Sequence, residues 1–151
     1  MRLLLPALCA TIIAGPALFA GPAWAGDGAD SPASIAKYTK AMLGKHPCAL
    51  KSGEISLTGS CAVKASGSKT ADGIATYAMT GNPGQVALSG VITPSLEGGS
   101  FAGERQCNGK GKPAVAYKGE LKRQGKKLWQ GELTPATRSP LCGPVTLILG
   151  K

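Results

Sequence analysis

Histidine, aspartate and aromatic side chains are scarce in this sequence, and their scarcity limits the chemistry that it can support. His46 is the one histidine, so a Ser-His-Asp or Cys-His centre would have to use it. It stands before Pro47-Cys48, where we expect a surface loop. Asp72 is the one aspartate beyond the N-terminal tail, and Asp72-Gly73 is typical of a turn. We therefore predict a protein that is not an enzyme. The alternative is a small hydrolase that uses His46 or the scattered glutamates.

Sequence motifs for cofactors and metals are missing as well. There is no glycine-rich phosphate-binding loop, no dinucleotide fingerprint, no haem attachment motif and no Cys-x-x-Cys pair. We predict no cofactor and no metal. The sequence has only two Trp, three Tyr and two Phe. Nucleic-acid binding would require aromatic side chains interleaved with the basic ones, so we predict no nucleic-acid partner.

An apolar run fills residues 3–25, after the charged side chain of Arg2, and ends in an Ala-x-Ala pattern at Ala25. This arrangement is typical of a secretory signal peptide. The run is long enough for a membrane anchor, but three prolines within it argue against a regular helix. We predict a signal peptide over residues 1–25 and a periplasmic or secreted mature chain without a transmembrane segment.

Four cysteines remain after residue 25, and they are Cys48, Cys61, Cys107 and Cys142. An even number of cysteines in an exported chain indicates disulfides, and each bridge would stabilise the fold by about 3 kcal/mol. Three pairings are possible. The pairs Cys48–Cys61 and Cys107–Cys142 close the shortest loops, but the sequence does not choose among the three.

The segment 26–47 is predicted to contain a flexible N-terminus and one short amphipathic helix. Ser31 is a suitable N-cap, and Pro32 suits the first helical position. Gly44 is a plausible end of the helix. Its apolar stripe would consist of Ile35, Tyr38, Met42 and Leu43.

The segment 48–151 has short apolar stretches separated by glycine and proline turns, a pattern typical of β-structure. Short links between successive strands indicate an antiparallel meander, and a meander of about eight strands removes its edges by closing. We predict a small, disulfide-braced up-and-down β-barrel, with the helix packed on it or plugging one end. A two-sheet β-sandwich is the alternative. The expected strands lie near residues 53–58, 60–66, 73–80, 85–93, 99–107, 113–123, 126–134 and 144–150.

Two predicted hairpins contain paired glycines. The segment 117–133 reads nearly the same in both directions about Gly125, and this symmetry suggests its register. Glycines inside strands are expected where the backbone bends sharply or approaches another backbone closely. The symmetric register pairs Tyr117 with Leu133, Gly119 with Gly131, and Leu121 with Trp129. The earlier hairpin, within residues 86–107, would pair Gly90 with Gly103 and Ile92 with Phe101.

A barrel of about eight strands is either filled by its own side chains or holds one small ligand, and the sequence leaves both possibilities open. The few large side chains of the hairpins are expected on the inward face. If the barrel binds a small apolar ligand, the candidate ligand-facing residues are Phe101, Tyr117, Leu121 and Trp129.

Residues 65–73, Ala-Ser-Gly-Ser-Lys-Thr-Ala-Asp-Gly, resemble the Ser-Ala-Ser-Gly loop of the C-type lysozyme inhibitors. Those proteins are small exported bacterial β-barrels whose loop enters the lysozyme cleft. The resemblance covers nine residues, and the second motif of the family is absent, so it does not identify the chain as a member. In the plain interpretation the segment is a flexible hairpin tip. The resemblance implies that the inserting residues would be Ser66, Gly67, Ser68 and Lys69.

Basic side chains are concentrated in the C-terminal part of the chain. Residues 26–106 contain seven Lys and Arg against six Asp and Glu, whereas residues 107–151 contain nine against two. Among the basic residues, Arg123, Lys126 and Lys127 form the predicted tip of one hairpin, which makes them a second candidate interaction loop.

These features together favour a non-enzymatic binding module. Export, paired cysteines and a meander without a catalytic set are typical of such proteins. Its partner would be a protein, as for an inhibitor, or a small apolar ligand, contacted through the barrel loops or interior. The alternative is a surface or structural protein that binds anionic polymers of the cell envelope through its basic C-terminal half.

Overall fold

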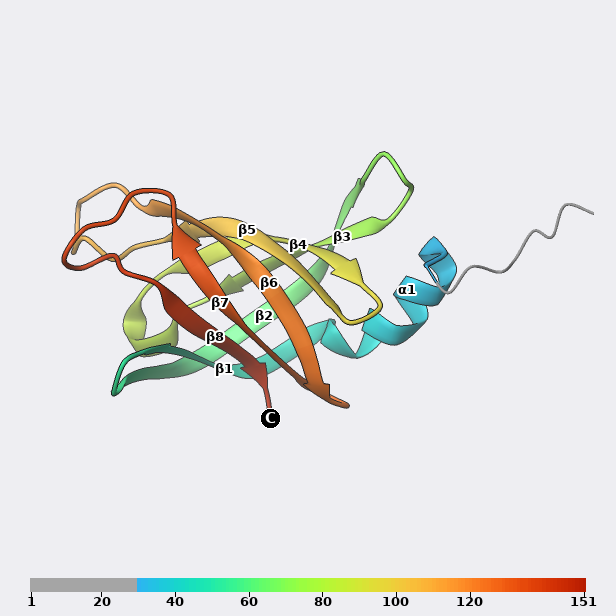
Figure 1. The fold of residues 1–151 in the computed structure, drawn as a ribbon, viewed down its shortest axis with the longest axis horizontal. Helices are drawn as coiled ribbons and strands as arrows, with labels where there is room; N and C mark the ends of the chain where they lie inside the picture. The colour runs from blue at the N-terminus through green and yellow to red at the C-terminus, as the bar shows by residue number, and fades with distance from the viewer. Residues whose placement is uncertain (1–29) are drawn as a thin grey trace, which may run out of the picture.

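The fold is a closed β-barrel with a short helical segment at one end (Figure 1). The computed structural model describes residues 30–151, so the predicted signal peptide and its cleavage site lie outside the described residues. Each strand pairs antiparallel with the next one along the chain, and the first strand pairs with the last. The predicted up-and-down barrel is confirmed, and the sandwich alternative is wrong. The strands are β1 (Gly44–Ser52), β2 (Ile55–Lys69), β3 (Ala75–Gly81), β4 (Leu88–Ser95), β5 (Gly98–Arg105), β6 (Val115–Gly125), β7 (Leu128–Pro135) and β8 (Val145–Gly150).

The first strand differs from the prediction. β1 occupies residues for which the sequence predicts no strand, because Pro47 and the neighbouring glycine and lysines weaken its apolar alternation. Its buried side chains nevertheless alternate along the chain, at His46, Cys48 and Leu50. The barrel therefore begins directly after the helical segment, with no loop between them.

The second strand is longer than predicted. β2 runs without a break where the sequence predicts two strands, because Gly59 does not mark a turn. A Cβ at Gly59 would lie only 2.7 Å from the backbone of Asn82 and Pro83, which belong to the connection between β3 and β4. This glycine permits a close approach of two backbones.

The hairpin of β6 and β7 has a register two residues away from the symmetric one that the sequence suggests. Gly119 lies opposite Leu133 rather than opposite Gly131. The shift arises at the tip, where the register is irregular between Arg123 and Gly125. A shift of two residues keeps every side chain on its predicted face. The hairpin of β4 and β5 has the predicted pairs, Gly90 with Gly103 and Ile92 with Phe101.

The helical segment forms where the sequence predicts it. α1 (Pro32–Thr39) continues as the single turn η1 (Lys40–Met42). The Ser31 hydroxyl caps α1 by accepting a hydrogen bond from the Ser34 amide at 3.2 Å. Among residues 30–151, no helix has the length and apolar character that a membrane crossing requires.

This helical segment covers one end of the barrel (Figure 1). Met42 is fully buried among the core side chains. The Thr39 hydroxyl lies 2.9 Å from the hydroxyl of Tyr77, a buried residue of β3. The predicted apolar stripe is wrong in two members, because Tyr38 and Leu43 are exposed, while Thr39 is buried.

Side chains of the barrel itself fill its interior. His46 belongs to this interior, because β1 carries it into the barrel wall, and the expectation of a surface loop there is wrong. Its Nε2 lies 2.9 Å from the Met42 carbonyl oxygen, and its ring meets the Trp129 ring edge-on with 5.9 Å between centroids. The other large, fully buried side chains include Phe101, Leu50, Met79, Leu88, Ile92, Leu121, Leu133, Leu147 and Leu149.

Two disulfides brace the barrel. Cys48–Cys61 joins the paired strands β1 and β2, and Cys107–Cys142 joins the loop after β5 to the loop before β8. These are the pairs that close the shortest loops. Disulfides persist in non-reducing surroundings, so the protein is suited to an environment of the extracellular type.

The substitution Gly131→Ala tests the close contact between β6 and β7. A Cβ at Gly131 would collide with the carbonyl group of Glu120, whose backbone is held in the barrel. We expect the free energy of unfolding to fall by about 3 kcal/mol, because a backbone in a closed sheet cannot move away. Urea unfolding followed by circular dichroism measures this change.

The matched control is Gly125→Ala in the same hairpin. Its Cβ would have only an ordinary contact, at 3.8 Å from the Cβ of Leu128. We expect this variant to change the stability by less than about 1 kcal/mol. Similar losses in the two variants would contradict the role given to Gly131.

Candidate ligand site at the open end of the barrel

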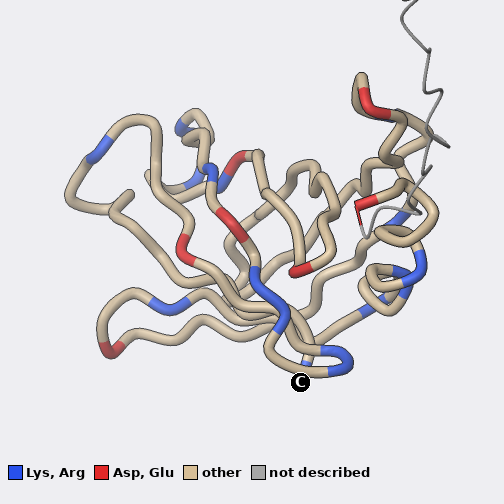
Figure 2. The backbone as a smooth tube through the Cα atoms, turned by 45° about the vertical axis from the view of Figure 1, so that its right-hand side comes forward, with Lys and Arg blue, Asp and Glu red and all other residues tan. Residues whose placement is uncertain are grey.

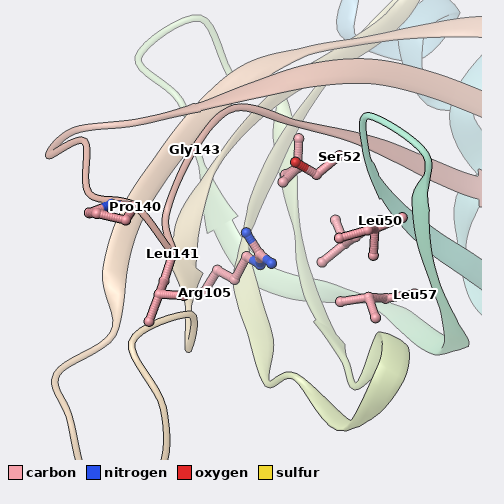
Figure 3. A pocket seen from close by; sticks show the side chains of 9 residues that line it. Leu50, Ser52, Leu57, Arg105, Pro140, Leu141 and Gly143 are labelled. Carbon is pink, nitrogen blue, oxygen red and sulfur yellow. The ribbon is translucent and has the colours of Figure 1, made fainter.

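The end of the barrel opposite the helical segment contains a surface hollow (Figure 3). It lies between the ends of β1 and β2 and the loop 136–144, and its volume is about 310 Å³. We refer to it as the mouth hollow. It is lined by Leu50, Ser52, Ile55, Leu57, Arg105, Pro140, Leu141, Gly143 and Val145.

Among the described residues, Arg105 is the one charged side chain that lines the mouth hollow. It is the last residue of β5 and has the same parity as Phe101, so the alternation of the strand turns it toward the inside of the barrel. Only 8% of the residue is exposed. Figure 3 shows its guanidinium within the hollow, facing Leu50, Ser52 and Leu57.

The guanidinium of Arg105 has fewer hydrogen-bond and ion-pair partners than a buried charge usually has. Its Nη1 donates a hydrogen bond to the Tyr117 hydroxyl at 3.2 Å, and its Cζ lies 5.7 Å from the centre of the Tyr117 ring. Its Nε has no hydrogen-bond partner among the described residues. No Asp or Glu within residues 30–151 forms an ion pair with it. A guanidinium has five N–H donors, and burying a charge without a counter-charge is unfavourable.

The loop between β7 and β8 is fixed beside Arg105 by a covalent bond and a hydrogen bond. The disulfide Cys107–Cys142 ties this loop to a position two residues after Arg105. The Tyr117 hydroxyl, which accepts from Arg105, donates to the Gly143 carbonyl oxygen at 3.0 Å. This wall of the mouth hollow is therefore held in place before any ligand arrives, which lowers the cost of ordering it on binding.

Apolar side chains surround the guanidinium. Leu50 and Val145 are almost completely buried and form the floor of the mouth hollow. At its rim, Leu141 is 66% exposed and Ile55 is 65% exposed. Large apolar side chains that remain exposed beside a concave surface are typical of a binding site. The mouth hollow thus combines an apolar lining with one buried cation.

The four candidate ligand-facing residues lie deeper than the mouth hollow, in the packed interior. Phe101, Leu121 and Trp129 are buried among other core side chains. Tyr117 is buried as well and approaches the mouth hollow only through its hydroxyl, which contacts Arg105. Their assignment as ligand-facing residues stays a prediction.

The residues of the lysozyme-inhibitor-like segment lie in a strand, because β2 extends to Lys69. The expectation of a flexible hairpin tip over residues 65–73 is therefore wrong for this part, and the tip itself is the turn 70–74. The Ser66 hydroxyl donates to the Thr76 carbonyl oxygen at 3.0 Å, which ties the end of β2 to β3. The residues concerned are Ser66, Gly67, Ser68 and Lys69, and the hairpin that they belong to projects from the barrel near α1 (Figure 1).

The second candidate interaction loop lies at the same end as the helical segment. Arg123, Lys126 and Lys127 are exposed at the tip of the β6–β7 hairpin, next to the C-terminus (Figure 2). Lys110 and Lys112 lie in the loop after β5, at the open end. The structure therefore separates the two basic turns and does not bring them to the mouth hollow.

No sequence motif points to Arg105 as a functional residue, although one signal for it exists. Counting in twos from the inward Phe101 passes Gly103 and reaches Arg105, so the strand period places a cation where the barrel interior should continue. A charged residue at an inward position of a β-strand is unusual and indicates a site or a strand end. Here it is both.

Comparison with protein-family models, curated proteins and solved structures found no match for this chain. Within residues 30–151, no group of three or more His, Cys, Asp and Glu side chains is arranged to hold a metal ion. His46 lies in the interior and contacts the Met42 carbonyl oxygen.

The substitution Arg105→Met tests whether the buried charge serves the fold. It removes the charge and keeps a long unbranched side chain. We expect the ligand-free protein to gain about 1 kcal/mol of stability or more, because replacing an uncompensated buried charge by an apolar group relieves a desolvation cost. Urea unfolding at neutral pH measures the difference.

The comparison variant is Tyr117→Phe, which removes the hydroxyl between Arg105 and the Gly143 carbonyl oxygen. We expect its free energy of unfolding to fall by about 1 kcal/mol or somewhat more, because a buried hydrogen-bonding group is removed. If Arg105→Met destabilised the protein more than Tyr117→Phe, Arg105 would be a structural residue.

Proposed function

We propose that this protein is a non-enzymatic binding protein of a periplasmic or extracellular compartment, and that it holds a small, partly apolar molecule in the mouth hollow. The observation that carries the proposal is the concave site at the open end, where exposed Leu141 and Ile55 adjoin the buried Arg105. The two disulfides support the location. In this proposal, the ligand is bound by the fixed wall and the rim of the mouth hollow.

The filled interior supports binding at the mouth and not inside the barrel. Large side chains such as Trp129, Phe101 and Leu121 occupy the space between the strands. The mouth hollow, at about 310 Å³, lies at the lower end of the usual size of ligand pockets. At about 30 Å³ for each non-hydrogen atom, its volume corresponds to about ten such atoms. The ligand is therefore small, or it is a larger molecule of which only one end enters.

A titration of the nitrogen-15-labelled protein with 1-octanol and with octanoate tests the proposal by nuclear magnetic resonance. Both molecules have an apolar chain of a size that the mouth hollow accepts. We expect at least one of them to bind, with amide shifts confined to residues 52–57, 103–107 and 139–145. Binding by neither of these molecules nor by octyl phosphate would overturn the proposed function, and so would shifts centred on the helical end.

A variant of the rim makes this test quantitative. Leu141→Ser removes an exposed apolar side chain from the mouth hollow, and the fold should tolerate it because 66% of this residue is exposed. We expect the better-bound probe to lose about fivefold in affinity, since full burial of a leucine side chain contributes about 1.5–3 kcal/mol and the ligand covers part of it. The dissociation constant from the same titration is the readout.

Val91→Ser is the matched control for Leu141→Ser. Val91 is also an exposed apolar residue, at 43%, but it lies on β4 and does not line the mouth hollow. Its variant should bind the probe as the unmodified protein does. Equal weakening by both substitutions would argue against binding at the mouth hollow.

The second candidate function, binding of an anionic envelope polymer, is favoured by a different observation at the opposite end. Lys45, Lys127 and Lys151 border a surface hollow of about 450 Å³. They come from the start of β1, the β6–β7 turn and the C-terminus, and Figure 2 shows further basic residues along the adjacent helical segment. Positive charges gathered in this way attract a polyanion, with an affinity that falls as salt rises.

Two double charge reversals test this second candidate, with poly-L-glutamate as the polymer. Lys126→Glu/Lys127→Glu changes the helical end, and Lys110→Glu/Lys112→Glu makes the same change in net charge at the open end. We expect the first variant to lose more than about tenfold in affinity at low salt and the second much less. Equal losses would show that only the net charge matters, and intact binding in both would remove this candidate.

A further inference from the structure

We infer that the ligand of the mouth hollow is an amphipathic anion, whose carboxylate or phosphate group pairs with Arg105 and whose apolar part lies against Leu141 and Ile55. This inference rests on the proposed function, because it names the ligand class of the same site. It follows from three features of the mouth hollow: an uncompensated charge, free donors in a fixed plane, and an apolar rim around them.

The first feature is the uncompensated charge. Arginine carries a positive charge in proteins, and more than nine-tenths of Arg105 is buried. No carboxylate within residues 30–151 neutralises it. An anion that entered the mouth hollow would supply the missing counter-charge in a place where water screens it poorly. A neutral ligand would leave the charge of Arg105 uncompensated.

The second feature is the set of free donors. Tyr117 engages the guanidinium through Nη1 alone, so Nη2 has no acceptor among the described residues; Nε has none either, but that atom is buried. The Tyr117 hydroxyl is itself fixed by the Gly143 carbonyl oxygen, so the plane of the guanidinium is held from one side. A planar fork of N–H donors suits two oxygens of one carboxylate or phosphate group. The hydroxyl of Ser52, also in the lining, offers a further donor to the same anion.

The third feature is the apolar rim. An inorganic anion would use Arg105 and leave Leu141 and Ile55 exposed, so these two residues have a function only if the ligand continues beyond its charged group. Both side chains are about two-thirds exposed, whereas Leu50 and Val145 beside the guanidinium are buried. A ligand with its anionic end on Arg105 and its chain directed outward would cover the rim. This orientation places the charge deep in the site and the apolar chain near the surface.

The test compares three probes that share one eight-carbon chain: octanoate, octyl phosphate and 1-octanol. Their dissociation constants are measured by the same titration on the unmodified protein, on Arg105→Gln and on Arg138→Gln. Arg138 is an exposed arginine of the β7–β8 loop that does not line the mouth hollow. Its replacement by glutamine makes the same change in net charge away from the site. Acetate and inorganic phosphate serve as probes without a chain.

We expect the unmodified protein to bind octanoate or octyl phosphate at least tenfold more tightly than 1-octanol. In Arg105→Gln this preference should vanish while the affinity for 1-octanol changes less than about twofold, because the rim is unchanged. In Arg138→Gln the preference should persist. Acetate and inorganic phosphate should bind at least tenfold more weakly than the corresponding chain-bearing probe, which shows that the apolar part contributes. The better of the two anions identifies the headgroup.

Other outcomes would overturn specific parts of this inference or the proposed function itself. Equal binding of the anions and 1-octanol to the unmodified protein, a result that requires no variant, would overturn the anionic ligand and leave the proposed function standing. No binding by any of the three probes would overturn the proposed function and this inference together. A preference that survives in Arg105→Gln would show that another group recognises the anion. Tight binding of inorganic phosphate or acetate alone would overturn the amphipathic character.

Discussion

Pairing of β1 with β8 closes the sheet, and this closure determines where a ligand can bind. Leu50 lies opposite Leu147, and Cys48 lies opposite Leu149, so each strand of the barrel has a neighbour on both sides. In a barrel of eight strands the enclosed space is about wide enough for the inward side chains. Here those side chains occupy it. Because the interior is filled and the wall has no open edge, the two ends are the places where the barrel can offer a concave surface.

The two ends differ because of what the chain adds to each of them. At one end, the helical segment inserts Met42 into the core and covers the strands. At the other end, the inward row of β5 finishes on Arg105, which cannot pack as an apolar residue would. The result is a hollow lined by a cation whose one hydrogen bond among residues 30–151 goes to the Tyr117 hydroxyl. A charge in this position costs stability, and such a cost is most common at sites that bind something.

Much of the fold was predictable from the sequence, because strands with alternating apolar residues can be recognised from that pattern. The β4–β5 hairpin has the register that Gly90 and Gly103 indicate. The β6–β7 hairpin does not have the register that its symmetry about Gly125 suggests. An irregularity near the tip shifts the pairing by two residues. β1 was harder to predict for another reason: a proline and a histidine interrupt its apolar pattern, and only closure of the barrel makes it a strand.

The site could be predicted less well than the fold. Strand parity alone places Arg105 inward, but parity does not show that no carboxylate reaches it, which depends on where the acidic residues lie after folding. The importance of Leu141 was also hidden, because it lies in a loop without a motif. Its position becomes fixed through the neighbouring disulfide at Cys142 and the hydrogen bond from the Tyr117 hydroxyl to the Gly143 carbonyl oxygen. A property that arises from contacts between distant segments leaves no local pattern in the sequence.

Under the proposed function, the second disulfide connects stability with recognition. Cys107–Cys142 closes a loop of 35 residues, for which the restriction of the unfolded chain corresponds to about 4 kcal/mol. The same bond holds the loop that carries Leu141 and Gly143 beside the strand that ends at Arg105. The Tyr117 hydroxyl links these parts a second time, since it contacts both Arg105 and the Gly143 carbonyl oxygen. Without these two links a ligand would have to order the loop as it bound, and part of its binding free energy would be lost in doing so. With them, the wall and the cation are already in place, so even a small ligand with few contacts can be held.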